Sequence, residues 1–471
     1  MKVVVIGSGY VGSVTGIAFS ALGHQTTVVD IDINKVNTIL NGQSPIYEPG
    51  LDNLIEKFIG KTLSATTSYE CVKEADVVFI GVGTPSREDG TADLAYIKSA
   101  AKNIGENLNS NRFTVIVNKS TVPVGTADLV SGIIEDTSGL RRNADFAVVS
   151  NPEFLREGFA IEDVFFPDRI VIGTTSEQAR LIMRDLYSNL INRQGYGELI
   201  EGFQFNYAEK LNSPSPVYFE TDDKSSELIK YASNAFLAVK ISYVNEMARL
   251  CESLDANILD VALGMGLDSR IGNKFLQASS GWSGSCFPKD TAEILATSTS
   301  YNTKLSVVEA AVSSNLEMHD YCVSKVQHEL KSLNGKTIGI LGLTFKPNTD
   351  DARKTQASYI IEKLIALGAR VKVHDPQGME MFKSLNNNLD IEYYENPIEM
   401  TRNTDGIILL THWNEYIELD WKTIFDSVRN PYVFDTRNVL NHFSMVEIGF
   451  KYEGLGISQY NTIPYNVEAS V

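Results

Sequence analysis

One cysteine occupies a position where its thiol could take part in a reaction. Cys286 lies in the segment 284–290 (GSCFPKD), where Ser285 and Pro288 predict the start of a helix. The helix dipole and the nearby Lys289 both favour a thiolate. Beside a hydride-accepting cofactor, a thiolate captures an aldehyde as a thiohemiacetal, and a second oxidation gives a thioester that water converts to an acid. Cys286 therefore raises the possibility of a four-electron oxidation of an alcohol; the alternative is a buried structural cysteine.

Three polar residues have a spacing that could assist this thiol. Lys230 and Asn234 lie four residues apart in a helical pattern, so they share a face of the helix and could both donate to a developing oxyanion. A partly desolvated lysine could also act as a base. Asp290 follows Cys286 by four residues and would share its face if the helix begins there. The alternative for Lys230 and Asn234 is the solvated edge of an amphipathic helix.

Two further candidates follow predicted strands. Glu153, in the segment 151–158, comes after one strand, and Thr121 comes after another. Open α/β sheets bind their ligands at the carboxyl ends of strands. Glu153 could therefore be a general base for hydrolysis, with Thr121 holding the water. Both could instead be capping or turn residues.

The segment 7–12 (GSGYVG) is a dinucleotide fingerprint in its expected context. It follows an apolar strand and precedes a helical pattern, so its glycines allow a tight turn and a close approach to a pyrophosphate. Asp30 ends the next predicted strand, 18 residues after Gly12. A carboxylate there accepts from a ribose 2′-hydroxyl and repels a 2′-phosphate, which favours NAD over NADP. The alternative is a tight turn with no ligand.

The elements around these residues predict an α/β protein with two Rossmann-like doubly wound domains. Apolar, β-branched runs at 3–6, 26–29, 77–82, 114–117, 146–149 and 170–172 are typical of a parallel sheet buried on both faces. From residue 225 toward 250 the pattern predicts one long helix. Strands at 337–341, 371–374, 406–410 and 432–435 predict a second Rossmann-like domain. Residues 194–224 are interpreted as a surface excursion or linker.

The expected domains are an NAD-binding domain (1–222), a helical central dimerisation domain (223–333) and a Rossmann-like domain that binds the substrate (334–471). The second domain lacks a dinucleotide fingerprint, because Phe345 is too bulky for the third-glycine contact. Lys346 and Arg353 follow that turn and could serve another phosphorylated ligand, or be solvated surface cations.

Composition excludes several classes of protein. At 471 residues, with 43% hydrophobic and 21% charged residues, the chain is an ordinary globular protein. The net charge of −18 argues against nucleic acid or an anionic membrane as a partner. We expect no signal peptide, membrane span, disulfide framework or metal site, and a cytoplasmic location. Cys71, Cys251 and Cys322 are interpreted as structural.

Further motifs complete the pattern. They lie at 45–51 (PIYEPGL), 83–85 (GTP), 120–123 (STVP), 151–158 (NPEFLREG), 167–169 (PDR), 230–234 (KYASN), 270–276 (RIGNKFL), 345–347 (FKP) and 435–437 (DTR). With the fingerprint and the 284–290 segment, and in this order, they resemble the UDP-glucose/GDP-mannose dehydrogenase family along nearly the whole chain. The segments 270–276 and 286–290 are most similar to its UDP-glucose branch.

That resemblance implies two oxidations of a sugar C6 hydroxyl, without aldehyde release, using two NAD. It implies that Cys286 is the nucleophile, that Lys230 and Asn234 assist proton transfer and stabilise the oxyanion, and that Glu153, Thr121 and Asp290 handle water and protons. The implied NAD-binding residues are Gly7, Gly9, Tyr10, Val11, Gly12, Asp30, Lys35, Thr84, Thr121, Glu157, Lys289 and Arg353. The implied residues for UDP-glucose are Phe154, Leu155, Lys230, Asn234, Arg270, Phe275, Gln277, Ser279, Gly281, Ser283, Phe345, Lys346 and Arg437. Arg437 is expected to cross the interface of a homodimer, or of a larger homo-oligomer, built around the long helix.

The sequence departs from the family pattern at three places. Ser283 stands where a glycine is usual, Gln277 stands where a lysine is frequent, and the segment 194–216 is longer than usual. GDP-mannose and UDP-N-acetylhexosamines are therefore alternative substrates. A two-electron β-hydroxyacid dehydrogenase and a catalytically silent NAD-binding protein are the alternative functions.

Overall fold

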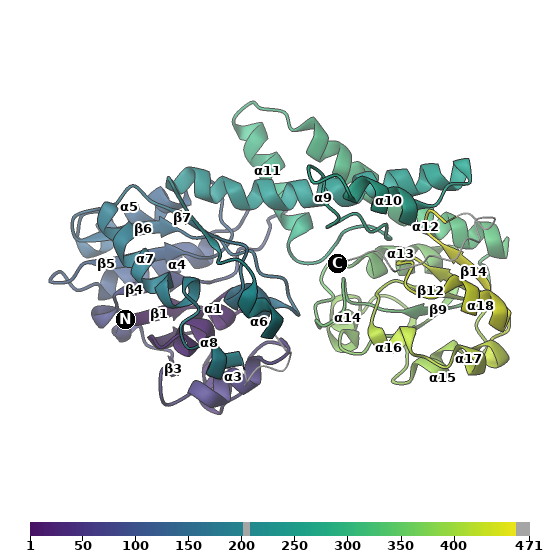
Figure 1. Ribbon diagram of the computed structural model, residues 1–471, viewed down its shortest axis with the longest axis horizontal. Coiled ribbons are helices and arrows are strands. Elements are labelled where there is room, and N and C mark those ends of the chain that lie inside the picture. Colours follow the sequence, from purple (N-terminus) through teal and green to yellow (C-terminus); the bar gives the residue numbers. More distant parts are fainter. Residues whose placement is uncertain (201–207, 458–471) are drawn as a thin grey trace. The chain divides into compact units, whose positions relative to one another are not determined.

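The structure is a computed structural model that describes residues 1–200 and 208–457. The described chain divides into two compact units. One comprises Met1–Ser233 with Ala292–Tyr301, and the other comprises Asn234–Thr291 with the described chain from Asn302. Each unit contains one β-sheet with its own helices (Figure 1). No helix in the described ranges is long and apolar enough to cross a membrane.

The first unit is built on an eight-stranded sheet with the order β3-β2-β1-β4-β5-β6-β7-β8. The strands are β1 (Lys2–Ile6), β2 (Gln25–Val29), β3 (Leu63–Thr66), β4 (Val77–Ile80), β5 (Thr114–Asn118), β6 (Phe146–Ser150), β7 (Arg169–Gly173) and β8 (Val217–Thr221). Strands β1 to β6 pair in parallel, in the 3-2-1-4-5-6 order of a Rossmann fold. The predicted doubly wound domain is confirmed, and all six predicted strands are present.

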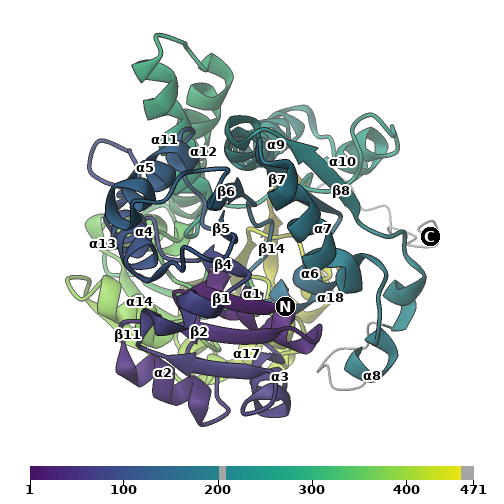
Figure 2. The same ribbon diagram turned by 90° about the vertical axis from the view of Figure 1, so that its left-hand side faces the viewer.

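Two apolar cores cover the two faces of this sheet, because successive strand residues point to opposite faces. Val3 and Val5 of β1 belong to one core, and Val4 and Ile6 belong to the other. The helices are α1 (Tyr10–Ala21), α2 (Ile33–Leu40), α3 (Leu51–Phe58), η1 (Tyr69–Glu74), α4 (Ala95–Asn107), α5 (Thr126–Ser138), α6 (Ala160–Phe165), α7 (Glu177–Ile191), α8 (Tyr196–Ile200) and η2 (Ala208–Asn212). Figure 2 shows α4 and α5 on one side of the sheet and α6 and α7 on the other.

The sheet differs from the prediction at one end. Strand β7 pairs with β6 in the antiparallel sense, so the sheet is not entirely parallel. The only helix between these strands, α6, has six residues and is about 9 Å long, which is shorter than a five-residue strand and too short for an ordinary helical crossover. Strand β8, with an exposed Val217, lies inside the predicted linker and pairs in parallel with β7. Residues 201–207 of the long segment 194–216 lie outside the described residues.

The second unit contains a six-stranded, entirely parallel sheet with the order β11-β10-β9-β12-β13-β14. Its strands are β9 (Thr337–Leu341), β10 (Arg370–His374), β11 (Ile391–Tyr393), β12 (Gly406–Leu409), β13 (Tyr432–Asp435) and β14 (Lys451–Gly454). Its helices are α13 (Gln356–Ala366), α14 (Met379–Leu385), α15 (Pro397–Thr401), α16 (Asn414–Ile417), α17 (Trp421–Ser427) and α18 (His442–Ile448). The order is again 3-2-1-4-5-6, so the predicted second Rossmann-like sheet is confirmed.

Four helices lie between the two sheets in the sequence. They are α9 (Asp223–Leu254), α10 (Ile258–Gly266), α11 (Phe287–Ser300) and α12 (Ser306–Leu330). Helix α9 is continuous over 32 residues, as the uninterrupted helical pattern predicts. Val244, Ala248 and Cys251 on one side of α9 pack with Ile258 of α10.

A buried glutamate fastens the first turns of α9 to the first sheet. Glu227 accepts hydrogen bonds from the N–H groups of Gly125 at 2.7 Å and Ala127 at 2.8 Å, both at the N-terminus of α5. It also accepts from the Ser150 hydroxyl at 3.1 Å, at the end of β6. Burial raises the pKa of Glu227 to about 7, and the two backbone donors limit that rise.

Replacing Glu227 should therefore destabilise the protein. In Glu227→Ala, two N–H groups at the α5 terminus lose their acceptor, and we expect unfolding to become easier by about 2–4 kcal/mol. Chemical denaturation followed by circular dichroism measures the change. The matched control is Glu106→Ala, at an exposed position of α4, which should change stability by about 0.5 kcal/mol or less. Equal effects for the two variants would contradict this account of Glu227.

Helices α12 and α13 are joined by an aromatic pair in the second unit. The ring of His319 stacks on that of Tyr359, with 5.0 Å between the centroids and an interplanar angle of 19°. His319 is buried, and neither ring nitrogen has a hydrogen-bond partner among the described residues. Burial lowers its pKa to about 4, and repulsion by Lys363 adds to this effect.

A neutral buried histidine makes the protein sensitive to acid. Because the pKa of His319 is lower in the folded state than its ordinary 6.5, the unfolded chain binds more protons as the pH falls from 6.5 toward 4. Between pH 6.5 and 5, this group should lower the free energy of unfolding by about 2 kcal/mol. His319→Phe keeps an aromatic ring without the titration, so its thermal midpoint should fall less between pH 7 and 5 than that of the unmutated protein. Substitution of the exposed His328 by Gln is the control, and an unchanged pH slope in His319→Phe would refute the assignment.

Candidate functional site

The glycines of the fingerprint turn differ in their surroundings. Gly7 has φ +96°, and a Cβ added at Gly12 would lie 1.9 Å from the Gly7 carbonyl oxygen, so the turn and the start of α1 require glycine at both positions. A Cβ at Gly9, the residue before α1, would meet nothing within 4 Å. The turn is therefore closely packed at Gly7 and Gly12, while its backbone at Gly9 is open at the N-terminus of α1. This arrangement fits the pyrophosphate of NAD.

Asp30 lies just beyond β2, beside this turn. Its carboxylate accepts from the Ser8 N–H at 2.7 Å and from the Ser8 hydroxyl at 2.6 Å. Burial raises the pKa of Asp30, but hydrogen bonds from Ser8 and Asp32 outweigh burial and hold it below its usual value, with help from the charge of Lys35. Asp30 is thus an ionised acceptor next to the glycine-rich turn, as the sequence predicts for a ribose-binding residue.

Glu48 of the 45–51 motif links the fingerprint to the 151–158 segment. Its carboxylate accepts from the Tyr10 hydroxyl and from the N–H groups of Gly158 at 2.6 Å and Ala160 at 2.7 Å. Burial raises the pKa of Glu48, and these donors oppose the rise. In the sequence, the only signal for Glu48 is that a glutamate stands inside an otherwise apolar motif.

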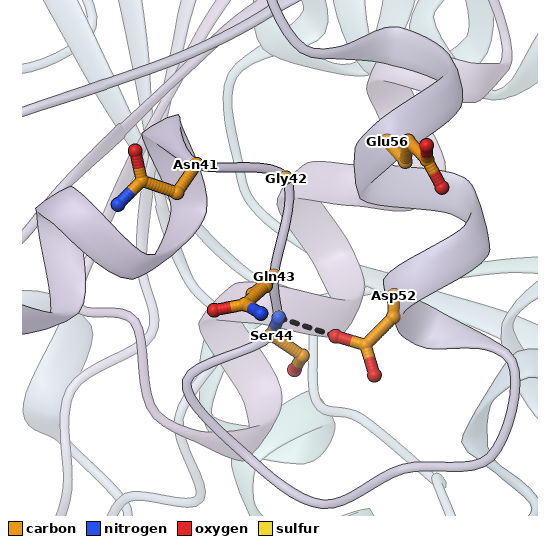
Figure 3. A pocket seen from close by; sticks show the side chains of 6 residues that line it. All are labelled: Asn41, Gly42, Gln43, Ser44, Asp52 and Glu56. Atoms are coloured by element: carbon orange, nitrogen blue, oxygen red, sulfur yellow. Dashed lines mark hydrogen bonds between the residues drawn. The ribbon is translucent and has the colours of Figure 1, made fainter.

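A surface hollow lies beside the same motif (Figure 3). It is lined by Asn41, Gly42, Gln43, Ser44, Asp52 and Glu56, with the Ser44 N–H donating to Asp52 at 2.6 Å. None of the predicted site residues lines it. Its two carboxylates disfavour a nucleotide phosphate.

Lys230 and Glu153 form a buried ion pair in the first unit. Lys230 Nζ lies 2.9 Å from Glu153 Oε1, and the two side chains are 5% and 7% exposed. Burial raises the pKa of Glu153, but the charge and hydrogen bond of Lys230, together with the Leu155 N–H at 2.5 Å, hold it below its usual value. Glu153 is therefore a carboxylate that can accept a proton, and Lys230 is a buried donor beside it. The ion pair links α9 to the 151–158 segment, a contact that the sequence did not predict.

The ring of Phe154 lies next to this pair. Arg169 stacks over it at 3.9 Å and Lys230 lies 5.4 Å from its centre. Leu155 donates its N–H to Glu153. Both residues thus help to set the position of the pair.

A second lysine and two threonines lie close by. Lys119, two residues before Thr121, donates to the Asn151 side chain at 3.1 Å. Burial lowers the pKa of Lys119 to about 8, and the nearby Lys230 adds to this effect. The Thr84 hydroxyl donates to the Thr121 carbonyl at 2.8 Å. One small cavity is lined by Asn118, Ser120, Thr121, Val122, Ser150, Pro152, Glu227 and Lys230. Thr121 and Lys230 thus line the same cavity. Lys119 is a further candidate for a functional residue, and its sequence context gave no signal for it.

Cys286 lies at the N-terminus of α11 in the second unit. Its carbonyl accepts the Asp290 N–H at 2.8 Å, so Cys286, and not the expected Ser285, occupies the position just before the helix. Its side chain is half-buried. Asp290 is buried and accepts from Asn234 at 2.6 Å and from Lys289 at 2.6 Å. Asn234, Lys289 and Asp290 thus form one hydrogen-bonded group around the first turn after the thiol.

The other three cysteines have unreactive surroundings. Burial raises the pKa of Cys322 to about 12 and that of Cys71 to about 11, and it also raises the pKa of Cys251. At neutral pH these groups are thiols and not thiolates. Their burial agrees with the structural role predicted for them.

The segment 275–284 leads to Cys286 through several constrained residues. Phe275 has a positive φ of 64°, which is strained for an aromatic residue. A Cβ at Gly281 would lie 2.7 Å from Asn315 Oδ1 and 2.9 Å from His319 Nε2, so only glycine fits there. Ser279 is buried and donates its N–H to Asn245 at 2.8 Å, whereas Gln277 is exposed.

The predicted nucleotide residues of the second sheet lie together. Arg437, after β13, donates to the Leu410 carbonyl at 2.6 Å and to the Phe345 carbonyl at 3.4 Å. Lys346 Nζ lies 5.3 Å from the centre of the Phe345 ring. Arg353 pairs with Asp351 at 2.7 Å. The expectation that Arg437 crosses a dimer interface stays a prediction; within the chain its guanidinium donates to two backbone carbonyls. Arg270 is 87% exposed on its side chain and pairs with Asp268.

The predicted residues fall into the two units. The first unit holds Gly7, Gly9, Tyr10, Val11, Gly12, Asp30, Lys35, Thr84, Thr121, Glu153, Phe154, Leu155, Glu157 and Lys230. The second holds Asn234, Arg270, Phe275, Gln277, Ser279, Gly281, Ser283, Cys286, Lys289, Asp290, Phe345, Lys346, Arg353 and Arg437. No group of His, Cys, Asp and Glu side chains suited to a metal ion occurs in the described part of the chain.

Comparison with known proteins identifies the family. Residues 1–191, 224–317 and 339–442 match the NAD binding, central and UDP binding domains of the UDP-glucose/GDP-mannose dehydrogenase family. A UDP-glucose 6-dehydrogenase of Rhizobium meliloti is 44% identical over 97% of this chain and 99% of its own length, and the Bacillus subtilis UDP-glucose 6-dehydrogenase TuaD is 40% identical over 97% and 93%. The structure of a UDP-glucose dehydrogenase from Pyrobaculum islandicum has a TM-score of 0.84 and 35% identity, and the match covers 97% of this chain and 98% of that one. The chain therefore belongs to the UDP-glucose/GDP-mannose dehydrogenase family of NAD-dependent oxidoreductases.

Proposed function

We propose that this protein oxidises C6 of UDP-glucose to the carboxylate of UDP-glucuronate, in two NAD-dependent steps that pass through a thioester on Cys286. The observation that carries the proposal is the position of Cys286 as the half-buried residue before α11, next to the hydrogen-bonded Asn234 and Asp290. The UDP binding domain match at residues 339–442 supports a nucleotide sugar, and relatives named UDP-glucose 6-dehydrogenase support glucose as the sugar.

The chemistry divides among the chain's residues. NAD, when bound, accepts the hydride of each oxidation. After the first oxidation the Cys286 thiolate adds to the aldehyde carbon, which forms the S–C bond and turns the carbonyl oxygen into an oxyanion. Lys230 and Asn234 donate to oxyanions on the sugar, and one such donor stabilises a transition state by about 3 kcal/mol. After the second oxidation gives the thioester, Glu153 takes a proton from water, the hydroxide adds to the acyl carbon, and the S–C bond breaks.

The nucleotide requires positive charge and an aromatic surface. In the proposal Lys346, Arg437 and Phe345 hold the uridine diphosphate. The segment 277–283 holds the sugar, together with Arg270 and Phe275, which precede it in the sequence. The three domains (1–222, 223–333 and 334–471) remain a prediction, and the three matched family regions fall inside them.

Product stoichiometry tests the reaction. With UDP-glucose limiting, the unmutated protein should form two NADH per sugar, because both oxidations occur before release. Cys286→Ser lacks the nucleophile, so its turnover should fall by about a hundredfold or more. Absorbance at 340 nm together with chromatography of the nucleotide sugars measures both quantities. Cys71→Ser replaces another partly buried cysteine and should keep the stoichiometry of two.

The other outcomes separate the alternatives. One NADH per sugar in both proteins would mean a two-electron dehydrogenase in which Cys286 is structural. If GDP-mannose or a UDP-N-acetylhexosamine is turned over faster than UDP-glucose, that sugar is the substrate. Tight NAD binding with no turnover of any nucleotide sugar would favour a silent binding protein.

We also propose that the chain forms a homodimer through the outer face of α9. Phe236, Tyr243 and Leu250 recur every seven residues, so they lie on one side of the helix, and they are 64%, 48% and 48% exposed. Leu263 of α10 and Leu267, just after that helix, are also exposed. An apolar row of this kind is typical of a surface that associates with another chain. Self-association of two identical helices buries the row on both copies.

A charge on this row should prevent association. Phe236→Glu with Tyr243→Glu places two carboxylates in the interface without a partner, so light scattering after size-exclusion chromatography should report a monomer where the unmutated protein is a dimer or larger. Leu181→Glu, at an exposed leucine of α7 in the other unit, is the control and should keep the oligomer. An unmutated protein that elutes as a monomer would end this proposal.

A further inference from the structure

Ser283 lies three residues before Cys286, at a position where the family pattern has glycine. The structure gives its side chain a specific partner. The Ser283 hydroxyl donates to the Oε1 atom of Gln356, the first residue of α13. Gln356 is fully buried, so its amide oxygen depends on this donor for a hydrogen bond inside the protein.

The amide of Gln356 extends the contact toward the predicted nucleotide residues. Its Nε2 atom lies 3.5 Å from the Leu410 carbonyl oxygen, which also accepts from Arg437 at 2.6 Å. Arg437 donates in turn to the Phe345 carbonyl at 3.4 Å. A row of polar groups therefore runs from Ser283 to the residues proposed to hold the uridine diphosphate.

The residues on either side of Ser283 are held separately. Trp282 exchanges two backbone hydrogen bonds with the Asn315 side chain at 2.7 and 2.9 Å, and its indole N–H donates to Ser242 at 2.9 Å. A Cβ at Gly284 would lie 2.8 Å from the Phe345 ring, so the backbone packs against that ring. With both neighbours fixed, the remaining freedom at this position is the rotamer of Ser283 itself.

We propose that Ser283 and Gln356 act as a positioning pair that turns the serine side chain away from the sugar of the nucleotide-sugar substrate. This inference rests on the proposed function, in which the segment 277–283 holds the sugar. With its hydroxyl held by Gln356, Ser283 adds only its Cβ to the space that glycine would leave. Without Gln356, the hydroxyl occupies other rotamers and crowds the sugar, so the pair sets the affinity for the substrate.

A double-mutant cycle tests the pair. In Gln356→Ala, KM for UDP-glucose should rise about tenfold while kcat changes about twofold or less, because the sugar is bound less well and the reacting groups are unchanged. In the double variant Ser283→Gly with Gln356→Ala, no hydroxyl remains to crowd the sugar, so KM should return to within about threefold of the unmutated value. Ser283→Gly alone completes the cycle. Gln377→Ala, at an exposed glutamine after β10, is the matched control.

The outcomes decide the proposal in both directions. Rescue of KM by Ser283→Gly supports it, since a merely structural role for Gln356 would not be repaired by removing a second side chain. An unchanged KM in Gln356→Ala, or a KM that stays high in the double variant, would overturn it.

A second readout separates this proposal from the proposed function. The rate of alkylation of Cys286 by iodoacetamide, with and without UDP-glucose and in the absence of NAD, needs no turnover. If the unmutated protein forms no NADH from UDP-glucose, the proposed function fails, but the pair is still tested by this rate. Protection of Cys286 by UDP-glucose should weaken in Gln356→Ala and recover in the double variant, and equal protection in all variants would reject the pair.

Discussion

The buried ion pair between Lys230 and Glu153 is the interaction on which the arrangement of candidate residues in the first unit depends. Removing two charges from water costs several kcal/mol per ion, and the mutual attraction at 2.9 Å offsets this only while both partners remain. The charges hold each other in place, and the Leu155 N–H fixes one carboxylate oxygen. The ion pair therefore ties the 151–158 segment to α9, and Glu153 stays an ionised acceptor in a buried position.

Helix α9 extends this arrangement along one face. Glu227, Lys230 and Asn234 are spaced by three and four residues, so they lie in a row. Each meets a different segment: the N-terminus of α5, the carboxylate of Glu153, and the carboxylate of Asp290. The outer side of the same helix carries Phe236, Tyr243 and Leu250. One long helix thus carries buried polar residues that meet other segments of the chain and apolar residues that are exposed to solvent.

Sequence patterns predicted the elements that local propensity and hydrophobic periodicity determine. Long apolar strands, the glycine-rich turn and the uninterrupted α9 follow from propensity and periodicity, and all are present. The patterns missed β3, β8, β11 and β14, which are short strands at or near sheet edges without a continuous apolar run. Glu227 and Gln356 were missed for another reason. An acidic residue near a helix start and a glutamine after a loop are ordinary in sequence, and only tertiary contacts give them partners.

The two Rossmann-like sheets share one topology but differ at the acidic residue that follows the second strand. Asp30 and Asp375 both follow the second strand of their sheets, and both accept from the turn after the first strand. Asp30 is half-buried and keeps surface beside the open backbone of Gly9. Asp375 is fully buried and accepts from Leu343, Thr344, Gln377, Gly378 and the indole of Trp413. Its acceptor capacity is consumed inside the protein, so it has none left for a ribose. The side chains that follow the turn, Phe345 and Lys346, are therefore the ones that the proposed function assigns to the nucleotide.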